Sequence, residues 1–251
     1  MNKKANKKQG DPKVSLTFRR FELKYQIEKR VADRIIPHLL DHMAWDEYVG
    51  EAESYQVNSL YFDSPHLKNY HEKLDGLLNR KKPRIRNYSR DFDDNSKLFF
   101  ELKRRSGDVI LKDRILVQGK DFKKFVADPI SLLQNKEYDP EFVNEFLFEI
   151  MNYQMTPQVL VSYDRKPFFS RQDKRFRVTF DYDLEIAAPV GADYHNKYRK
   201  INHDIVVMEV KFNGAMPQWF RKVIEKYHLD RESYSKYCHG IESLYGLPKI
   251  Q

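Results

Sequence analysis

The sequence predicts one α+β domain, and three observations lead to this prediction. Segments in which apolar and polar residues alternate, as they do in strands, are mixed with amphipathic segments of helical period. Six of the strand segments share one arrangement, two charged residues separated by a single residue. The 251 residues contain neither an internal repeat nor a low-complexity linker, so we expect a single folded body over residues 14–251.

The composition excludes several classes of protein. Aromatic residues make up 14% of the chain, which argues against disorder because chains that cannot fold are usually poor in aromatic residues. The single cysteine, Cys238, excludes a disulfide scaffold and a cysteine-rich metal site. The longest apolar runs are far shorter than the roughly 20 residues that a membrane helix needs. We therefore expect a soluble, cytoplasmic protein with no transmembrane segment of its own.

Half of the net positive charge lies at the N-terminus. Residues 1–13 contain five lysines and one aspartate, which together give +4 of the net charge of +8. This composition predicts a disordered basic arm over residues 1–13. The other +4 is spread over the rest of the chain, so a generally basic surface for nucleic acid is not expected.

The first half of the chain is expected to begin with a strand and an amphipathic helix, whose apolar stripe runs from Val31 to Met43. A second strand is predicted by alternation, and Asp63-Ser64-Pro65 then starts a second helix with a proline in its first turn. Three more strands follow, the last two joined by a turn at Ser106-Gly107-Asp108. The expected bounds are 17–25, 28–43, 55–62, 63–77, 83–90, 97–104 and 109–117.

The second half is expected to be helical in three pieces and then to return to strands. Pro129 and Pro140 mark the starts of the second and third helical pieces. A polar loop over 187–204 precedes the last strand, and the C-terminal segment is helical with a break near Leu229-Asp230. The expected bounds are 121–127, 129–134, 140–152, 157–165, 168–171, 175–184, 205–212 and 217–245.

The paired charges are the most informative feature of the sequence. Residues at positions i and i+2 of a strand lie on the same face, and in five of the six segments the residue between them is apolar and faces the other way. Nine of these twelve charged residues are basic. The six segments are Glu22-Leu-Lys24, Arg84-Ile-Arg86, Glu101-Leu-Lys103, Lys112-Asp-Arg114, Arg175-Phe-Arg177 and Glu209-Val-Lys211.

Two interpretations of the charged faces are open. Each face could simply meet water, as one face of an antiparallel sheet often does. Alternatively, the strands could close into a barrel, which would place the charges in its interior. Rows of like charge repel one another, so an interior of this kind makes sense if an anionic ligand neutralises it.

The residue types suggest phosphate as that ligand. Arginine binds phosphate oxygens in a bidentate manner, and lysine supplies a point charge. Glutamate is an oxygen ligand for Mg²⁺ or Mn²⁺, which bridges phosphates. A triphosphate or a longer phosphate chain would fit a narrow interior, whereas duplex nucleic acid would not. Asp181 is a further candidate acid, although its place near a strand end also suits a turn.

Eight short motifs, in this order, resemble the VTC domain, the polyphosphate polymerase domain of vacuolar transporter chaperone complexes and their bacterial relatives. This family is a branch of the triphosphate tunnel metalloenzymes. The resemblance runs from about Phe18 to Tyr245. The motifs are Arg20-Phe-Glu22-Leu-Lys24-Tyr25, Ser59-Leu-Tyr61-Phe62-Asp63, Arg84-Ile-Arg86, Glu101-Leu-Lys103, Tyr163-Asp-Arg165-Lys-Pro167-Phe168, Arg177-Val-Thr-Phe-Asp181, Glu209-Val-Lys211 and Ser235-Lys236-Tyr237.

The resemblance implies a closed, tunnel-like barrel of about eight antiparallel strands with helices packed outside. It also implies ATP as the phosphoryl donor, polyphosphate as the acceptor, and Mn²⁺ or Mg²⁺ as the cofactor. The residues expected to act on phosphates from the tunnel wall are Lys24, Arg84, Arg86, Lys103, Lys112, Arg165 and Arg177. Further substrate-binding residues are expected at Arg114, Arg175, Lys211, Ser235 and Lys236.

The metal ligands are expected to be acidic. Glu209 is the first candidate, and Glu22 is the second. Other tunnel enzymes have a glutamate two residues before the position of Glu22, where this chain has Arg20. This departure resembles the VTC branch and favours a polymerase over a simple triphosphatase, but it leaves the role of Glu22 open.

The expected function is therefore an ATP-dependent polyphosphate polymerase. Two alternatives stay open at this point, a tunnel triphosphatase and a polyphosphate-binding module without catalysis. The resemblance also implies a possible membrane-protein partner that receives the product.

Overall fold

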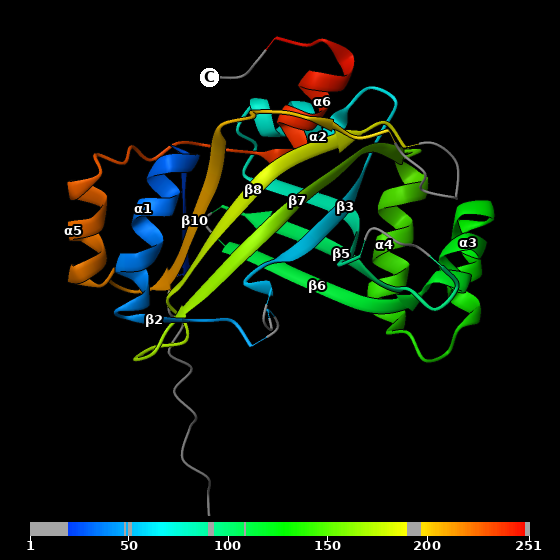
Figure 1. Ribbon diagram of the computed structural model, residues 1–251. Coiled ribbons are helices and arrows are strands. Elements are labelled where there is room, and N and C mark those ends of the chain that lie inside the picture. Colours follow the sequence, from blue (N-terminus) through cyan, green and yellow to red (C-terminus); the bar gives the residue numbers. More distant parts are fainter. Residues whose placement is uncertain are drawn as a thin grey trace, which may run out of the picture.

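The computed structural model describes residues 20–47, 49, 52–89, 93–107, 109–189 and 197–248. The basic arm expected over residues 1–13 lies outside this part of the chain. Within it, the chain folds as predicted into a mixed α+β domain, built on one large antiparallel sheet with helices packed against it (Figure 1).

The sheet has ten strands, of which eight form a continuous path in the order β1-β10-β8-β7-β3-β4-β5-β6. Two short strands lie off this path, β2 beside β7 and β9 beside β8. The strands are β1 (Arg20–Glu28), β2 (Met43–Trp45), β3 (Tyr55–Asp63), β4 (Asn79–Asn87), β5 (Lys97–Ser106), β6 (Val109–Gln118), β7 (Thr156–Ser170), β8 (Arg177–Ala187), β9 (Arg199–Lys200) and β10 (Ile205–Asn213).

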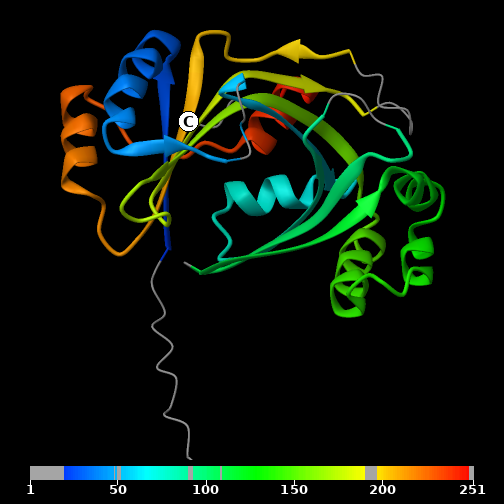
Figure 2. The ribbon, with the colours of Figure 1, turned by 60° about the horizontal axis from the view of Figure 1, so that its bottom comes forward.

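The expected closed barrel is not confirmed, because β1 and β6 are the two ends of the path and do not pair with each other in the described residues. The free edge of β1 is covered by the segment that leads into the last helix. There, the amide of Glu232 donates to the carbonyl of Lys24 over 3.0 Å. This segment takes the position that a closing strand would need, so the sheet forms an open, strongly curved trough (Figure 2).

Two groups of helices cover the convex face of the sheet. Helices α1 (Lys29–Leu40) and α5 (Gln218–Lys226) pack against β1, β8 and β10. Helices α3 (Gly119–Ala127) and α4 (Pro140–Asn152), with the short 3₁₀ helix η2 (Pro129–Gln134), pack against β4, β5 and β6. Each group buries its apolar face in a separate cluster, so the convex side of the sheet has two apolar cores.

The remaining two helices lie on the concave side. They are α2 (Lys68–Leu74), drawn in cyan within the curve of the sheet in Figure 2, and α6 (Lys236–Tyr245). Tyr70 of α2 and Ile241 of α6 share a third apolar cluster with concave residues of the sheet, among them Val57 and Val161. One end of the concave side is therefore filled by apolar packing.

A glycine lets α6 approach the sheet closely. A Cβ atom at Gly240 would lie 2.9 Å from Cγ2 of Val159 and 3.5 Å from Cγ2 of Val161. Real Cβ contacts are not this short, so the helix needs a residue without a side chain at this point. The close contact holds the middle of α6 against the concave face.

Most predicted elements are confirmed within a few residues, and four details differ. The expected strands 157–165 and 168–171 are one continuous strand, β7. The expected C-terminal helix is two helices, α5 and α6, separated by residues 227–235 without helix. Strands β2 and β9 were not predicted. The described residues include no helix that is both long enough and apolar enough to cross a membrane.

Candidate phosphate site in a charged trough

Most of the paired charges predicted from the sequence lie on the concave face, in front of the apolar cluster of α2 and α6. Alternation places their intervening apolar neighbours, such as Leu102, Ile85 and Val210, in the convex clusters. We call the concave polar surface the charged trough. Its members are Glu22, Lys24, Arg84, Arg86, Glu101, Lys103, Lys112, Arg165, Asp181, Glu209, Lys211 and Lys236.

The two halves of the trough face each other. Lys103 on β5 and Glu209 on β10 have four strands between them in the order of the sheet. Nevertheless, the charges of Glu22, Lys24 and Glu209 all influence the titration of Lys103. Burial, reinforced by neighbouring cations, lowers the pKa of Lys103 to about 8. The curvature of the sheet thus brings both ends of the path around one space.

The first charge cluster is centred on Glu101, whose side chain has no exposed surface. Its two oxygens bind Arg84 Nε at 2.7 Å and Lys112 Nζ at 2.8 Å. Burial alone would raise the pKa of Glu101, but Arg84 and the other nearby cations lower it to about 2. Glu101 therefore stays ionised and orients two of the expected phosphate ligands.

The second cluster is centred on Asp181, which is also completely buried. Arg165 binds it in a bidentate manner, with Nε–Oδ1 and Nη2–Oδ2 distances of 2.7 and 2.8 Å. Lys236 Nζ, at the start of α6, lies 2.5 Å from Oδ2. These cations outweigh the effect of burial and lower the pKa of Asp181. Asp181 thus belongs to a strand and pairs with cations, which excludes the turn considered from the sequence.

The third cluster contains the expected metal ligands. Glu209 forms an ion pair with Lys211, and Glu22 lies 3.5 Å from Lys24. Burial alone would raise the pKa of Glu209, but Lys211 and Lys24 hold it well below its usual range. Glu209 and Glu22 are close, since β1 and β10 pair Lys24 with Glu209 and Glu22 with Lys211.

This donor set fits Mn²⁺ or Mg²⁺. The described residues contain no group of three or more acidic, histidine or cysteine ligands. A metal that bridges substrate phosphates needs only one or two protein carboxylates, because phosphates and waters supply its other oxygens. Thr179, which pairs with Glu209 in register, adds a buried hydroxyl with no hydrogen-bond partner among the described residues. Glu209, Glu22 and Thr179 together offer only oxygen atoms.

Two tyrosines complete the trough and were not assigned a role from the sequence. Arg86 and Arg165 both donate to the hydroxyl of Tyr163, at 3.5 and 3.3 Å. Arg84 donates to the hydroxyl of Tyr61 at 3.3 Å. Although burial alone would raise the pKa of Tyr61, Arg84 and Arg86 lower it to about 8. Both tyrosines belong to the motifs named in the sequence analysis. Their alternation with buried residues could have predicted that they face the trough.

A row of cations was also missed. Arg80 and Lys82 continue the alternation of β4 beyond Arg84, and they pair in register with Arg105 and Lys103 of β5. Burial, together with neighbouring cations, lowers the pKa of both Arg80 and Lys82. The sequence Asn79–Asn87 contains this four-residue pattern in full, but only its last two members were singled out. The row leads from the trough toward α2 and α6.

Four expected residues lie at the border of the trough or outside it. Arg177 is half-exposed, with Nη1 3.9 Å from Asp46. Arg114 belongs to the exposed strand β6, and its guanidinium group lies over the ring of Phe99. Ser235 caps α6 by accepting from the amide of Cys238 at 3.3 Å. Arg175 lies before β8 in an exposed turn, where it pairs with Asp173, so the structure does not bring it to the other site residues.

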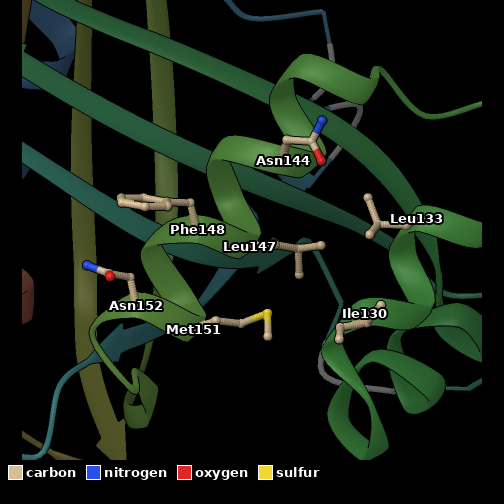
Figure 3. A pocket seen from close by; sticks show the side chains of 7 residues that line it. All are labelled: Ile130, Leu133, Asn144, Leu147, Phe148, Met151 and Asn152. Atoms are coloured by element: carbon tan, nitrogen blue, oxygen red, sulfur yellow. The ribbon is translucent and has the colours of Figure 1, made fainter.

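An apolar groove lies elsewhere, on the convex side between η2 and α4 (Figure 3). It is lined by Leu133, Phe148 and Met151, all of which are about half exposed. Its wall contains no charged residue, so it has no chemistry in common with the trough.

Comparison with known proteins identifies relatives of the whole folded part. Residues 19–245 match the VTC domain family. Two curated relatives, from Trypanosoma brucei brucei and Trypanosoma cruzi, are both named vacuolar transporter chaperone complex subunit 4. They are 27% and 25% identical over 92% of this chain. The chain spans 35% of the length of each relative.

Among solved structures, a proposed adenylate cyclase from Bacillus halodurans is similar in fold. The superposition covers 85% of this chain and 92% of the other, with a TM-score of 0.51 and 14% sequence identity. At this identity the likeness concerns the fold alone.

Proposed function

Because the chain belongs to the VTC domain family, we propose that it is an ATP-dependent polyphosphate polymerase that works in the charged trough. The observation that carries this proposal is the balance of charge. Eight cations of the trough share four carboxylates, and the row of Arg80, Lys82 and Arg105 adds further positive charge. Most of these cations are buried or half-buried, and such cations in excess of their counter-ions are unfavourable unless an anion joins them. A phosphate chain supplies many charges in a narrow path.

The proposed reaction needs little covalent chemistry from the protein. An oxygen of the terminal phosphate of the polyphosphate chain attacks the γ-phosphorus of ATP, and the bond from that phosphorus to the β–γ bridging oxygen breaks. The electron pair leaves with ADP. The attacking oxygen is already anionic near neutral pH, so no general base is required. Positioning and charge stabilisation provide the rate enhancement in such transfers.

The trough residues have separate roles in this proposal. Arg84 and Arg165, held by Glu101 and Asp181, present their remaining N–H groups to the transferred phosphate. Lys236 closes the same space from the start of α6. Glu209 and Glu22 would hold Mn²⁺ or Mg²⁺, which when bound neutralises charge on the phosphates.

An assay with ATP and Mn²⁺ tests the proposal. A polymerase releases ADP and forms a ladder of polyphosphate on a gel. Release of inorganic phosphate alone would contradict it and indicate a triphosphatase. Tight binding of polyphosphate without ATP turnover would instead indicate a binding module.

A matched pair of arginines supplies the control. Arg84→Ala should reduce turnover by about 100-fold or more, since this side chain would contact the transition state. Arg175→Ala should leave turnover unchanged, because Arg175 is exposed and lies outside the trough. Equal rates in wild type and Arg84→Ala would refute the assignment of the trough.

A partner protein is part of the proposal. The names of the curated relatives describe subunits of a vacuolar transporter chaperone complex, and this supports the expectation of a membrane partner that receives the product.

A further inference from the structure

The concave face ends, next to Arg86 and Arg165, in three aromatic side chains that we call the aromatic rim: Tyr55, Tyr88 and Phe99. Tyr55 is the first residue of β3, Tyr88 follows the last residue of β4, and Phe99 is near the start of β5. Register places Phe99 directly beside Arg86. Tyr88 is two residues beyond Arg86 on the same face, roughly 7 Å farther along the strand.

The members of the rim contact one another edge to face. The ring centroids of Tyr55 and Tyr88 are 5.6 Å apart, and those of Tyr88 and Phe99 are 5.7 Å apart. The guanidinium group of Arg114 lies 4.6 Å from the centroid of Phe99. The rim thus combines flat apolar surfaces with an arginine, a cation that also stacks on rings.

Packing of the core explains only one member of the rim, Tyr55, which packs against the cluster shared by α2 and α6. In the described part of the chain, neither Tyr88 nor Phe99 belongs to any of the three apolar clusters. Tyr88 is 41% exposed although it is a large aromatic residue. Exposed aromatic surface next to a polar site often marks a place where a ligand binds.

The two ends of the trough differ in chemistry. At the opposite end, α2 and α6 fill the concave side, and the cations Arg80, Lys82 and Arg105 line the approach to them. The cation-lined approach suits a ligand made only of phosphate. The aromatic rim suits a ligand with a flat ring attached to its phosphates.

We propose that the aromatic rim binds the base of the nucleotide donor, so that the donor enters at this edge and the phosphate chain extends toward α2 and α6. This proposal rests on the proposed function, because it assumes that the donor's phosphates occupy the trough. A base stacked on Tyr88 or Phe99 would be followed by its phosphates beside Arg86 and Arg84, in the order in which these groups occur in a nucleoside triphosphate. Stacking tolerates any purine, so the rim distinguishes nucleotides from inorganic triphosphate more than it distinguishes ATP from GTP.

The test compares two ligands that differ in the base. Calorimetry would measure the affinity of the full chain for an ATP analogue with a methylene group between the β- and γ-phosphates, and for inorganic tripolyphosphate. The variants are Tyr88→Ala/Phe99→Ala and the milder Tyr88→Leu/Phe99→Leu, which keeps apolar volume but loses the aromatic faces. Phe148→Ala is the matched control, because Phe148 is an exposed aromatic residue of the distant convex groove (Figure 3).

We expect both rim variants to bind the ATP analogue roughly 5- to 100-fold more weakly, while their affinity for tripolyphosphate changes by less than about twofold. The control should match wild type for both ligands. An unchanged affinity for the ATP analogue, or an equal loss for both ligands, would overturn the role of the rim while leaving the trough as a phosphate site. Failure of wild type to bind either ligand would overturn the proposed function as well.

Discussion

At the scale of single residues, buried acids organise the trough. Glu101 and Asp181 have no exposed side-chain surface, yet both are ionised because each contacts two cations. A buried charge without partners would be strongly unfavourable, so each acid and its cations depend on one another. The sequence predicted that Glu101 lies on the same face as Lys103. It did not predict the partner Arg84, because that contact depends on the register between β4 and β5.

Glu101→Gln should destabilise the fold by about 3 kcal/mol at pH 7. The value follows from a pKa that falls from 4.5 to about 2 on folding, at about 1.4 kcal/mol for each unit. A group with a lowered pKa stabilises the fold above its unfolded pKa and loses this effect as the pH falls toward the folded value. The difference between wild type and variant in urea denaturation should therefore shrink as the pH falls from about 4.5 to 2.

The exposed Glu137 provides the control, and Glu137→Gln should unfold like wild type at every pH. A constant difference between wild type and Glu101→Gln from pH 7 to pH 2 would refute the role of the Glu101 charge.

Tyr61 should make the affinity for polyphosphate depend on pH. Its pKa is about 8 in the free protein, because Arg84 and Arg86 outweigh the effect of burial, with a smaller contribution from Lys236. A bound polyanion opposes formation of the phenolate and raises this pKa. Above pH 8 the Tyr61 phenolate must take up a proton when polyphosphate binds. Deprotonation of Tyr61 should therefore weaken the affinity for polyphosphate by about tenfold between pH 7 and 9.

Tyr61→Phe should remove this part of the pH dependence in titrations without metal. Lys103, which also has a pKa of about 8, should leave a residual slope in the same direction. Tyr245→Phe, far along α6, is the control and should follow wild type. Identical pH profiles for wild type and Tyr61→Phe would contradict the placement of Tyr61 next to the bound anion.

At the scale of elements, α6 connects packing with the site. Its start carries Lys236 into the trough, and its middle packs on β7 and β8 through Gly240. The sequence predicted helix over 217–245 with a break near residue 229. It did not predict that the segment after the break covers the edge of β1, because that contact joins residues more than 200 positions apart.

Gly240→Ala should destabilise the fold by about 1 to 3 kcal/mol, although alanine normally favours a helix over glycine. The added Cβ would lie 2.9 Å from Val159, so α6 must move away from the sheet and displace Lys236 from Asp181. Thermal denaturation and turnover together measure the two effects.

The double variant Gly240→Ala/Val159→Ala supplies the control, because it restores the space. Its loss of stability should be smaller than the sum of the two single losses. Strict additivity would show that the close approach of α6 does not depend on the missing side chain.

At the scale of the whole molecule, curvature creates the site. Alternation along strands predicted one charged and one apolar face for most of these strands. The structure confirms this for β4, β5 and β10, because period and burial are local properties, whereas β6 is exposed on both faces from Val109 to Arg114. Whether the sheet closes depends on how its two outermost strands meet, and this cannot be predicted from a local sequence pattern. The result is an open trough with an apolar end, and a cation row leads from its centre toward that end.

Lys82→Ala/Arg105→Ala should weaken the binding of long polyphosphate by about tenfold or more, but that of tripolyphosphate by less than about twofold. A long chain would extend past the trough along these cations, whereas a short one would not reach them. The affinity of the variant for long polyphosphate should also depend less on salt concentration, since its binding releases fewer counter-ions.

Arg221→Ala/Lys222→Ala removes two exposed cations of α5 on the convex side and is the matched control. It should bind both ligands like wild type. Equal losses for long and short chains in Lys82→Ala/Arg105→Ala would contradict an extended path.

A crystal structure of the chain with tripolyphosphate and Mn²⁺ tests the central claim most directly. We predict phosphate density on the concave face between Arg84 and Arg165, with the metal next to Glu209. Phosphate bound only at exposed lysines of the convex side, with an unchanged and empty trough, would contradict the account.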